Sequence, residues 1–388
     1  SYGVVGGMRE TQFHLQAAVP EPPAAPTLSA PPVAQTIGAG STVVFAVGAR
    51  GVPAPVFQWR RGGTPLPGET RSTLVLRGTA ALAGGYSCVV TNDSGTVTSG
   101  EAMLTVNPVA ATALGRLANL SVLAPTGPGT RLLTMGATVG GQDTSGTLPL
   151  VVRGLGPALS AFNVTGVLAD PVLSIFPAGS TTASVTNDNW GGAPALITAF
   201  EQVAAFALPG PSLDSAALQN QAAGGFTVQV AGKGNAAGTI LAEVYDAAGG
   251  ARSATTPRLT NLSTLTAIAR GGTLSVGFVI GGSTARTILV RAVGPTLGTA
   301  FGLTGIMADP TLALFSNDRG VQIAENDNWN GAPWLVDLGA AVGAFPLGGP
   351  GTRDAALLIT LAPGAYSARV SGVGTSSGTA IVEVYEVP

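Results

Sequence analysis

Asn326-Asp327-Asn328-Trp329 decides the organisation of this 388-residue chain, because the same four residues recur as Asn187-Asp188-Asn189-Trp190. The match extends in both directions: residues 116–121 match 258–263, and residues 238–245 match 378–385. Solenoid repeats recur about every 20–50 residues, and this unit is far longer. We therefore predict a duplicated domain, with repeat 1 at residues 108–250 and repeat 2 at residues 251–388.

Composition and alternation indicate an all-β protein. Charged residues make up 10% of the chain, and Gly (56) and Pro (28) are abundant, which is typical of strands broken by turns. Apolar residues alternate with small or polar ones in runs such as 274–280 and 379–385. One short helix is expected in each repeat, headed by Pro194 and by Pro333, because proline suits the first helical turn.

Charge and apolar patterning argue against a nucleic-acid partner and against a membrane-spanning helix. The net charge is −2 and Lys233 is the one lysine, so no basic surface for nucleic acid is expected. No run of about 18 apolar residues is present, so no membrane-spanning helix is expected. The chain opens on Ser1 rather than Met, which fits a mature secreted form. We expect an extracellular, cell-surface location.

Residues 1–26 are predicted to form an N-terminal arm (residues 1–19) and a proline-rich spacer. Thr11, Phe13, Leu15, Ala17 and Val19 alternate with polar residues such as His14, which is strand periodicity. A strand without a sheet is marginal in water. Three interpretations stay open: a strand donated to a neighbouring molecule, an edge strand on its own domains, or a disordered terminus.

Residues 27–107 resemble a bacterial immunoglobulin-like domain. The resemblance is carried by Phe57-Gln58-Trp59-Arg60, which matches the strand with the core tryptophan, and by Gly84-Gly85-Tyr86-Ser87-Cys88, which matches the tyrosine corner. Val47 stands at the first cysteine position and Cys88 at the second. The resemblance implies a sandwich without the disulfide, whose core rests on the packing of Trp59 alone, with Tyr86 as the structural tyrosine of the corner. Such domains serve as spacers or binding modules.

The repeats resemble the pre-peptidase C-terminal type of β-sandwich, a jelly-roll module of secreted bacterial proteins. The matching segments in repeat 2 are Asp309-Pro310, Asn326 to Trp329, Asp354 to Leu357, and Gly364-Ala365-Tyr366. The whole repeat also looks like an uncharacterised tandem module that follows immunoglobulin-like domains in large bacterial surface proteins. The resemblance implies an arm, one immunoglobulin-like sandwich and two homologous jelly-roll-like sandwiches with short helices.

The duplicated tetrapeptide is a candidate calcium site. It places several hard oxygens within three residues, which calcium prefers; the candidate ligands are Asn187, Asp188, Asn189, Asn326, Asp327 and Asn328. Asp170 and Asp309, or Asp214 and Asp354, would complete such sites. The alternative is a structural turn in which Asn and Asp bond their own backbone, pinned by Trp190 and Trp329.

Common catalytic sets are absent from the sequence of the repeats. His14 is the sole histidine and lies in the arm, and Cys88 takes a core position, so triads with histidine, histidine-built zinc sites and cysteine nucleophiles are excluded. Glu243 and Glu383 are candidate carboxylates for glycoside hydrolysis. We favour a structural interpretation, in which Arg153 and Arg291 pair with them across strands.

Three functions follow, in order of preference. The first is a non-catalytic extracellular structural subunit that assembles head to tail into a filament or surface layer by donating its N-terminal strand. The second is an accessory module that binds carbohydrate or surface glycans, or mediates adhesion. The third is a carboxylate-based hydrolase. The partner expected first is a second copy of the chain.

Overall fold

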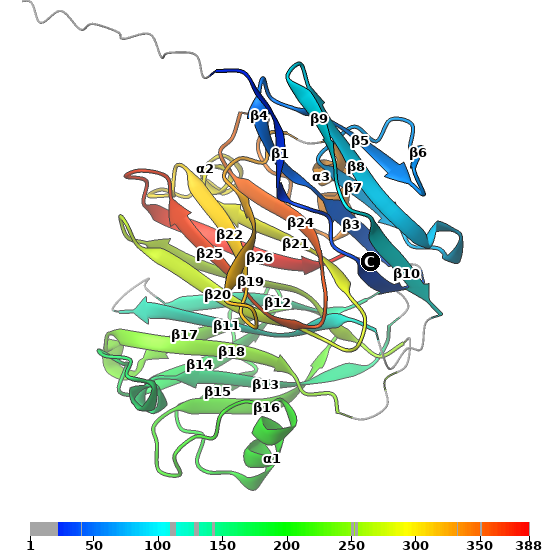
Figure 1. Ribbon diagram of the computed structural model, residues 1–388. Helices are drawn as coiled ribbons and strands as arrows, with labels where there is room; N and C mark the ends of the chain where they lie inside the picture. The colour runs from blue at the N-terminus through cyan, green and yellow to red at the C-terminus, as the bar shows by residue number, and fades with distance from the viewer. Residues whose placement is uncertain are drawn as a thin grey trace, which may run out of the picture.

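The computed structural model describes residues 22–39, 41–108, 114–127, 132–141, 144–249, 252, 255–331, 333–349 and 351–387. Strands dominate these residues, and the all-β class is confirmed. Figure 1 shows the N-terminal domain (blue to cyan) beside repeat 2 (yellow to red), with repeat 1 (green) at the far end. The predicted arm residues Thr11, Phe13, Leu15, Ala17 and Val19 lie outside the described residues.

The N-terminal domain is a sandwich of short strands. β1 (Ala24–Ala30) pairs with β4 (Gly48–Val52), and β3 (Thr42–Ala46) pairs with β7 (Thr73–Arg77). The facing sheet contains β2 (Gln35–Gly38), β10 (Ala102–Asn107), β8 (Gly84–Asn92), β5 (Val56–Arg61) and β6 (Thr64–Pro65) in that order, with β9 (Gly95–Thr98) beside β8. β1 includes the end of the predicted spacer, because an edge strand tolerates Pro26.

Aromatic rings hold the core of this domain. Trp59, Tyr86 and Cys88 are fully buried, and the Phe45 ring stacks on Tyr86 with 5.2 Å between centroids. The Tyr86 hydroxyl donates a hydrogen bond to the Leu82 carbonyl at 2.7 Å. Cys88 is a free thiol in the same core, so ring packing takes the place of a disulfide.

The two repeats contain the same elements in the same order. Repeat 1 has β11 (Arg116–Thr126), β12 (Leu133–Gly140), β13 (Thr147–Leu155), β14 (Pro171–Pro177), β15 (Val185–Asn187), α1 (Pro194–Gln202), β16 (Ser215–Ala222), β17 (Gly224–Gly232) and β18 (Gly238–Asp246). Repeat 2 has β19 (Arg258–Ile268), β20 (Thr273–Gly281), β21 (Arg286–Val293), α2 (Pro295–Phe301), β22 (Pro310–Ser316), β23 (Val321–Asn326), α3 (Pro333–Ala341), β24 (Ala355–Leu361), β25 (Gly364–Gly372) and β26 (Gly378–Glu386).

The helices predicted at Pro194 and Pro333 are confirmed as α1 and α3. Sequence patterns missed α2 and the matching 3-10 turn at Pro157–Phe162. Both are too short to show helical periodicity, and their first amides are bonded by an aspartate distant in the sequence.

The repeats exchange strands instead of closing separately. β11 of repeat 1 pairs with β20 of repeat 2, and β19 of repeat 2 pairs with β12 of repeat 1. Over the described residues the pairings give two eight-stranded sheets: β15-β14-β17-β12-β19-β26-β21-β24 and β23-β22-β25-β20-β11-β18-β13-β16. β11 and β19 meet at Leu117 and Leu259, which are equivalent residues. An approximate two-fold axis therefore relates the repeats.

One hydrophobic core lies between these sheets and includes residues of both repeats, such as Leu120, Val228, Leu262 and Val370. A second cluster in each repeat covers the outer face of the β13 or β21 sheet with the short helices and their loops. Because of the exchange, we call the paired repeats the tandem sandwich. Its two ends, β16 and β24, occupy equivalent positions.

Candidate functional site

The duplicated tetrapeptides are tied to the start of the neighbouring edge strand. The Asn187 amide donates to the Asn189 carbonyl at 2.9 Å, and its oxygen accepts from the Ala216 amide of β16 at 3.0 Å. Asn326 repeats both bonds with Asn328 and Ala356 at 3.0 Å each. These side-chain oxygens are thus already occupied by the backbone.

The carboxylates beside these turns contact basic side chains. Asp188 accepts from Lys233 at 2.8 Å, and the same ammonium lies 3.6 Å from Asp170. The hydrogen bond from Lys233 lowers the pKa of Asp188. In repeat 2, Arg353 contacts Asp309 at 2.6 Å.

Calcium binding at these turns stays a prediction. The Lys233 ammonium lies between the carboxylates of Asp170 and Asp188, in the position that a calcium ion would need to occupy. Within the described part of the chain, no group of three or more His, Cys, Asp or Glu side chains gathers for a metal. Repeat 2, whose Asp327 faces no lysine equivalent to Lys233 in the sequence, is the better candidate.

Asp214 and Asp354 are buried and bond main-chain groups at the start of the Pro157 and Pro295 turns. Asp214 accepts from the Gly156 amide at 2.8 Å, and Asp354 accepts from the Gly294 amide at 3.0 Å. Their backbone carbonyls accept from the amides of Trp190 and Trp329. Both aspartates therefore fix the turns and are unavailable as calcium ligands.

The predicted cross-strand pairs are confirmed. Arg153 lies opposite Glu243 and contacts it at 2.5 and 2.8 Å, and Arg291 makes the same contacts with Glu383 at 2.5 and 2.9 Å. Each guanidinium also donates to a loop carbonyl, at Phe206 or Phe345. All four side chains are buried, so each pair clamps the loop after a helix onto its sheet.

Trp190 and Trp329 are buried beside these clamps. The Trp190 indole donates to Ser212 at 3.1 Å and the Trp329 indole to Thr352 at 2.8 Å. Trp59, Trp190 and Trp329, and with them Tyr86, Tyr245, Tyr366 and Tyr385, all lie inside the fold. None of these rings offers a flat surface to a sugar.

The N-terminal domain docks on β24, an interface that sequence patterns did not indicate. β3 lies over the outer face of β24 and its neighbour β21, where the Val44 amide donates to the Thr360 hydroxyl at 2.6 Å. The Thr287 hydroxyl donates to the Thr42 carbonyl. The Val44 side chain is buried against the cluster of Leu289, Trp329 and Leu358.

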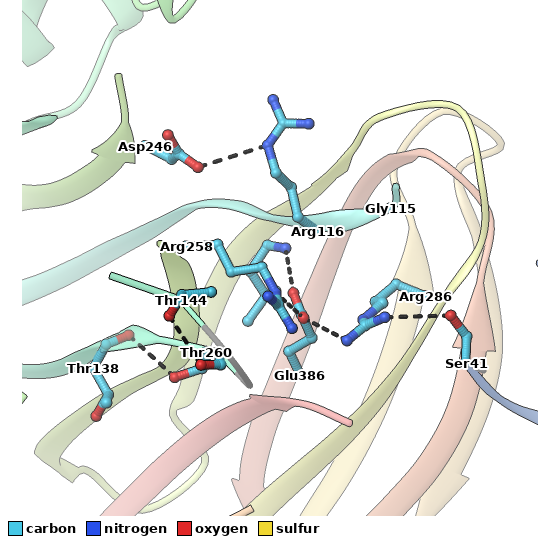
Figure 2. Close-up of polar contacts among 12 residues, drawn as sticks. Ser41, Gly115, Arg116, Thr138, Thr144, Asp246, Arg258, Thr260, Arg286 and Glu386 are labelled. Atoms are coloured by element: carbon cyan, nitrogen blue, oxygen red, sulfur yellow. Dashed lines mark hydrogen bonds and ion pairs between the residues drawn. The ribbon is translucent and has the colours of Figure 1, made fainter. Parts of the chain in front are cut away.

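A buried ionic junction strengthens this contact (Figure 2). The Glu386 carboxylate accepts from Arg258 and from Arg286 at 2.5 Å each, and Arg286 also donates to Ser41 of the N-terminal domain at 3.4 Å. Burial lowers the pKa of the Arg286 guanidinium, an effect that the Glu386 carboxylate opposes. The N-terminal domain is thus joined to repeat 2 by packing and by hydrogen bonds, one of them from a guanidinium of the junction.

The equivalent edge of repeat 1 is open. β16 pairs with β13 on one side, and among the described strands none pairs with its other side. Leu218 occupies the position of Leu358, yet 44% of it is exposed against 8% for Leu358. Val44 packs in the cluster around Leu358, and the cluster of repeat 1 contains no described residue of the N-terminal domain.

Comparison with known proteins concerns the N-terminal domain. The sequence model of the immunoglobulin domain family matches residues 25–92. This part of the chain is an immunoglobulin-like domain. No helix among the described residues has the length and apolar character needed to cross a membrane.

Two curated proteins are similar over part of the chain. Endoglucanase C of Cellulomonas fimi is 39% identical over 93 residues, 23% of this chain and 8% of its own length. Mouse hemicentin-2 is 33% identical over 118 residues, 28% of this chain and 2% of its own length. The chain thus spans a small fraction of both relatives.

Two solved structures are similar to 23% of this chain. Tandem Ig repeats of Dlar are 25% identical with a TM-score of 0.22, covering 23% of this chain and 51% of that one. A chimeric titin Z1Z2 is 33% identical with a TM-score of 0.21, covering 23% and 99%.

Proposed function

We propose that this chain is a non-catalytic extracellular structural subunit that joins copies of itself head to tail, by donating residues 11–19 as a strand to a neighbouring molecule. The observation that carries the proposal is the docking of β3 on β24. There the molecule already seats a separate domain on the outer face at the end of its own sheet, through hydroxyl bonds and a buried valine, and Gln35 bonds the Thr360 carbonyl of the edge strand.

The sandwich is well suited to such contacts. An open edge presents unpaired N–H and C=O groups, which an extended peptide can bond while its side chains fill alternate pockets. The alternating apolar face of residues 11–19 supplies such side chains. The clamps Arg153–Glu243 and Arg291–Glu383 serve stability, and neither is an exposed carboxylate pair in a cleft. Within this proposal the repeats are modules of the pre-peptidase C-terminal kind.

Electron microscopy and light scattering of the purified chain test the proposal. We expect fibres or a ladder of oligomers from the intact chain, and monomers from a chain lacking residues 1–19. The double variant Phe13→Asp and Leu15→Asp is the matched control, because it keeps the length and removes the apolar face. Monomers from the intact chain at all concentrations would overturn the proposal.

A second candidate is an accessory module that binds glucan, which the similarity to endoglucanase C favours. Retention of the chain on insoluble glucan, together with a monomeric state by light scattering, would favour this candidate over the first. The buried tryptophans Trp59, Trp190 and Trp329 give it little support.

A further inference from the structure

The two equivalent ends of the tandem sandwich differ in their cover. Val44 of the immunoglobulin-like domain covers the outer face of β24 and Gln35 bonds its Thr360 carbonyl, whereas Leu218 on β16 is exposed and none of the described strands pairs with the outer edge of β16. Resting on the proposed function, we infer that β16 is the edge that receives residues 11–19 of a second copy.

The backbone of β16 is arranged for this contact. The Ala216 amide points away from β13, since it bonds Asn187. Alternation along the strand then places the N–H and C=O groups of Leu218 and Asn220 on the same outer edge. At the matching position of β24, the Thr360 carbonyl accepts from Gln35 of the immunoglobulin-like domain at 3.4 Å. An incoming strand would bond the equivalent groups of β16.

The side chains of β16 favour an apolar strand. Leu218 is exposed where Leu358 is covered by Val44, so an apolar side chain from the incoming strand would fill the same place. The apolar face of residues 11–19 offers Phe13 and Leu15. β16 carries no charged residue over eight positions, whereas charges protect edges from pairing.

The other open edges of the tandem sandwich suit a strand less well. β15 is three residues long, and β23 carries Glu325. Short and charged edges are the usual means by which proteins avoid pairing. β16 is therefore the preferred acceptor.

Covalent geometry requires that donor and acceptor be different molecules. Residue 19 lies within about 11 Å of residue 22, since three residues span at most about 3.6 Å each. β16 is at the end of the sandwich farthest from the immunoglobulin-like domain (Figure 1), and β24 is at the near end. Seven spacings of about 4.8 Å separate β15 from β24 in one sheet and β23 from β16 in the other, which puts roughly 34 Å between the two ends of the sandwich. The donated strand cannot reach its own β16.

The test uses a peptide with the sequence of residues 9–20 and the chain lacking residues 1–19. Binding is measured by calorimetry for the parent and for three variants. Leu218→Arg puts a charge on the acceptor edge, and Asn220→Pro removes an outward N–H without breaking the β13 ladder. Val336→Arg is the matched control, because Val336 is 51% exposed in α3, away from β16.

We expect at least a tenfold loss of peptide affinity for both β16 variants and no change for Val336→Arg, with thermal unfolding showing that each variant is folded. Equal affinity for all variants, while the intact chain still forms fibres that need residues 1–19, would place the acceptor elsewhere and leave the proposed function standing. No peptide binding and no fibres would overturn both.

Discussion

The buried clamp in repeat 2 allows a quantitative test of what holds the loops on the sheet. Glu383→Gln keeps the side-chain volume and removes the charge that faces Arg291. The side chains are 5% and 2% exposed, so water cannot replace the lost partner. Removing one member of a buried pair costs about 3–5 kcal/mol, because the remaining charge stays buried and unpaired.

Urea unfolding of the full chain, followed by tryptophan fluorescence, measures this loss. With an m-value of about 3 kcal/mol per M, the midpoint should fall by about 1–1.7 M. Glu325→Gln is the control, since Glu325 is exposed and such changes usually stay within about 0.5 kcal/mol.

The pair of variants Arg291→Met and Glu383→Leu completes a double-mutant cycle. The double variant should lose less stability than either single one, because no unpaired charge remains. A midpoint shift for Glu383→Gln equal to that of Glu325→Gln, or additive losses in the cycle, would refute the clamp.

Asp354→Asn removes a charged acceptor from buried main-chain amides, and we expect a loss of about 2–4 kcal/mol by the same urea assay; a loss below about 0.5 kcal/mol would contradict its role. Lys233→Gln removes the main cause of the lowered pKa of Asp188, so the carboxyl pKa measured by NMR should rise toward about 3.9. A lowered pKa gives stability that is present above the unfolded value and lost as pH falls, so the variant should be less stable than the parent above about pH 4, and the difference should vanish as pH falls below that value. Burial and the neighbouring Glu carboxylates raise the pKa of Tyr245 and Tyr385, and this stability is lost only as pH rises through the raised values. Their phenolate absorbance should therefore appear together with unfolding, well above pH 10; gradual titration near pH 10 would show that the two phenols are exposed.

The duplication and the local elements could be predicted from the sequence, because they depend on local pattern. The tetrapeptide at Asn187 and Asn326 and the proline-headed helices follow from residues close in a strand or turn. The Arg153–Glu243 pair, 90 residues apart in the chain, could be predicted because the same Arg and Glu recur in repeat 2. The strand exchange at Leu117 and Leu259 could not, because β11 has the same pattern whether it pairs with β12 or with β20. Pairing choice depends on the whole fold.

The candidate site also has features that the sequence shows and features that only the folded structure shows. The run of uncharged residues in β16 is visible in the sequence, but Leu218 and Leu358 look alike there, and only the docked position of Val44 shows that one is covered. The role of Asp214 was equally hidden, since its bonded amide at Gly156 lies far away in the chain. The sequence suggested Asp214 and Asp354 as calcium ligands. In the structure their carboxylates accept hydrogen bonds from backbone amides and fix the two turns.

The strand exchange between the two repeats also explains why the proposed filament would grow head to tail. A two-fold axis makes the β16 and β24 edges equivalent, and two equivalent open edges would allow self-complementary pairing that closes into a dimer. The immunoglobulin-like domain covers β24 through Val44 and bonds its Thr360 carbonyl through Gln35, so of this equivalent pair only β16 remains open. Covering one edge with the domain that precedes the tandem sandwich leaves donor and acceptor as different surfaces at opposite ends. A contact between unlike surfaces repeats without closing, which is the condition for a filament.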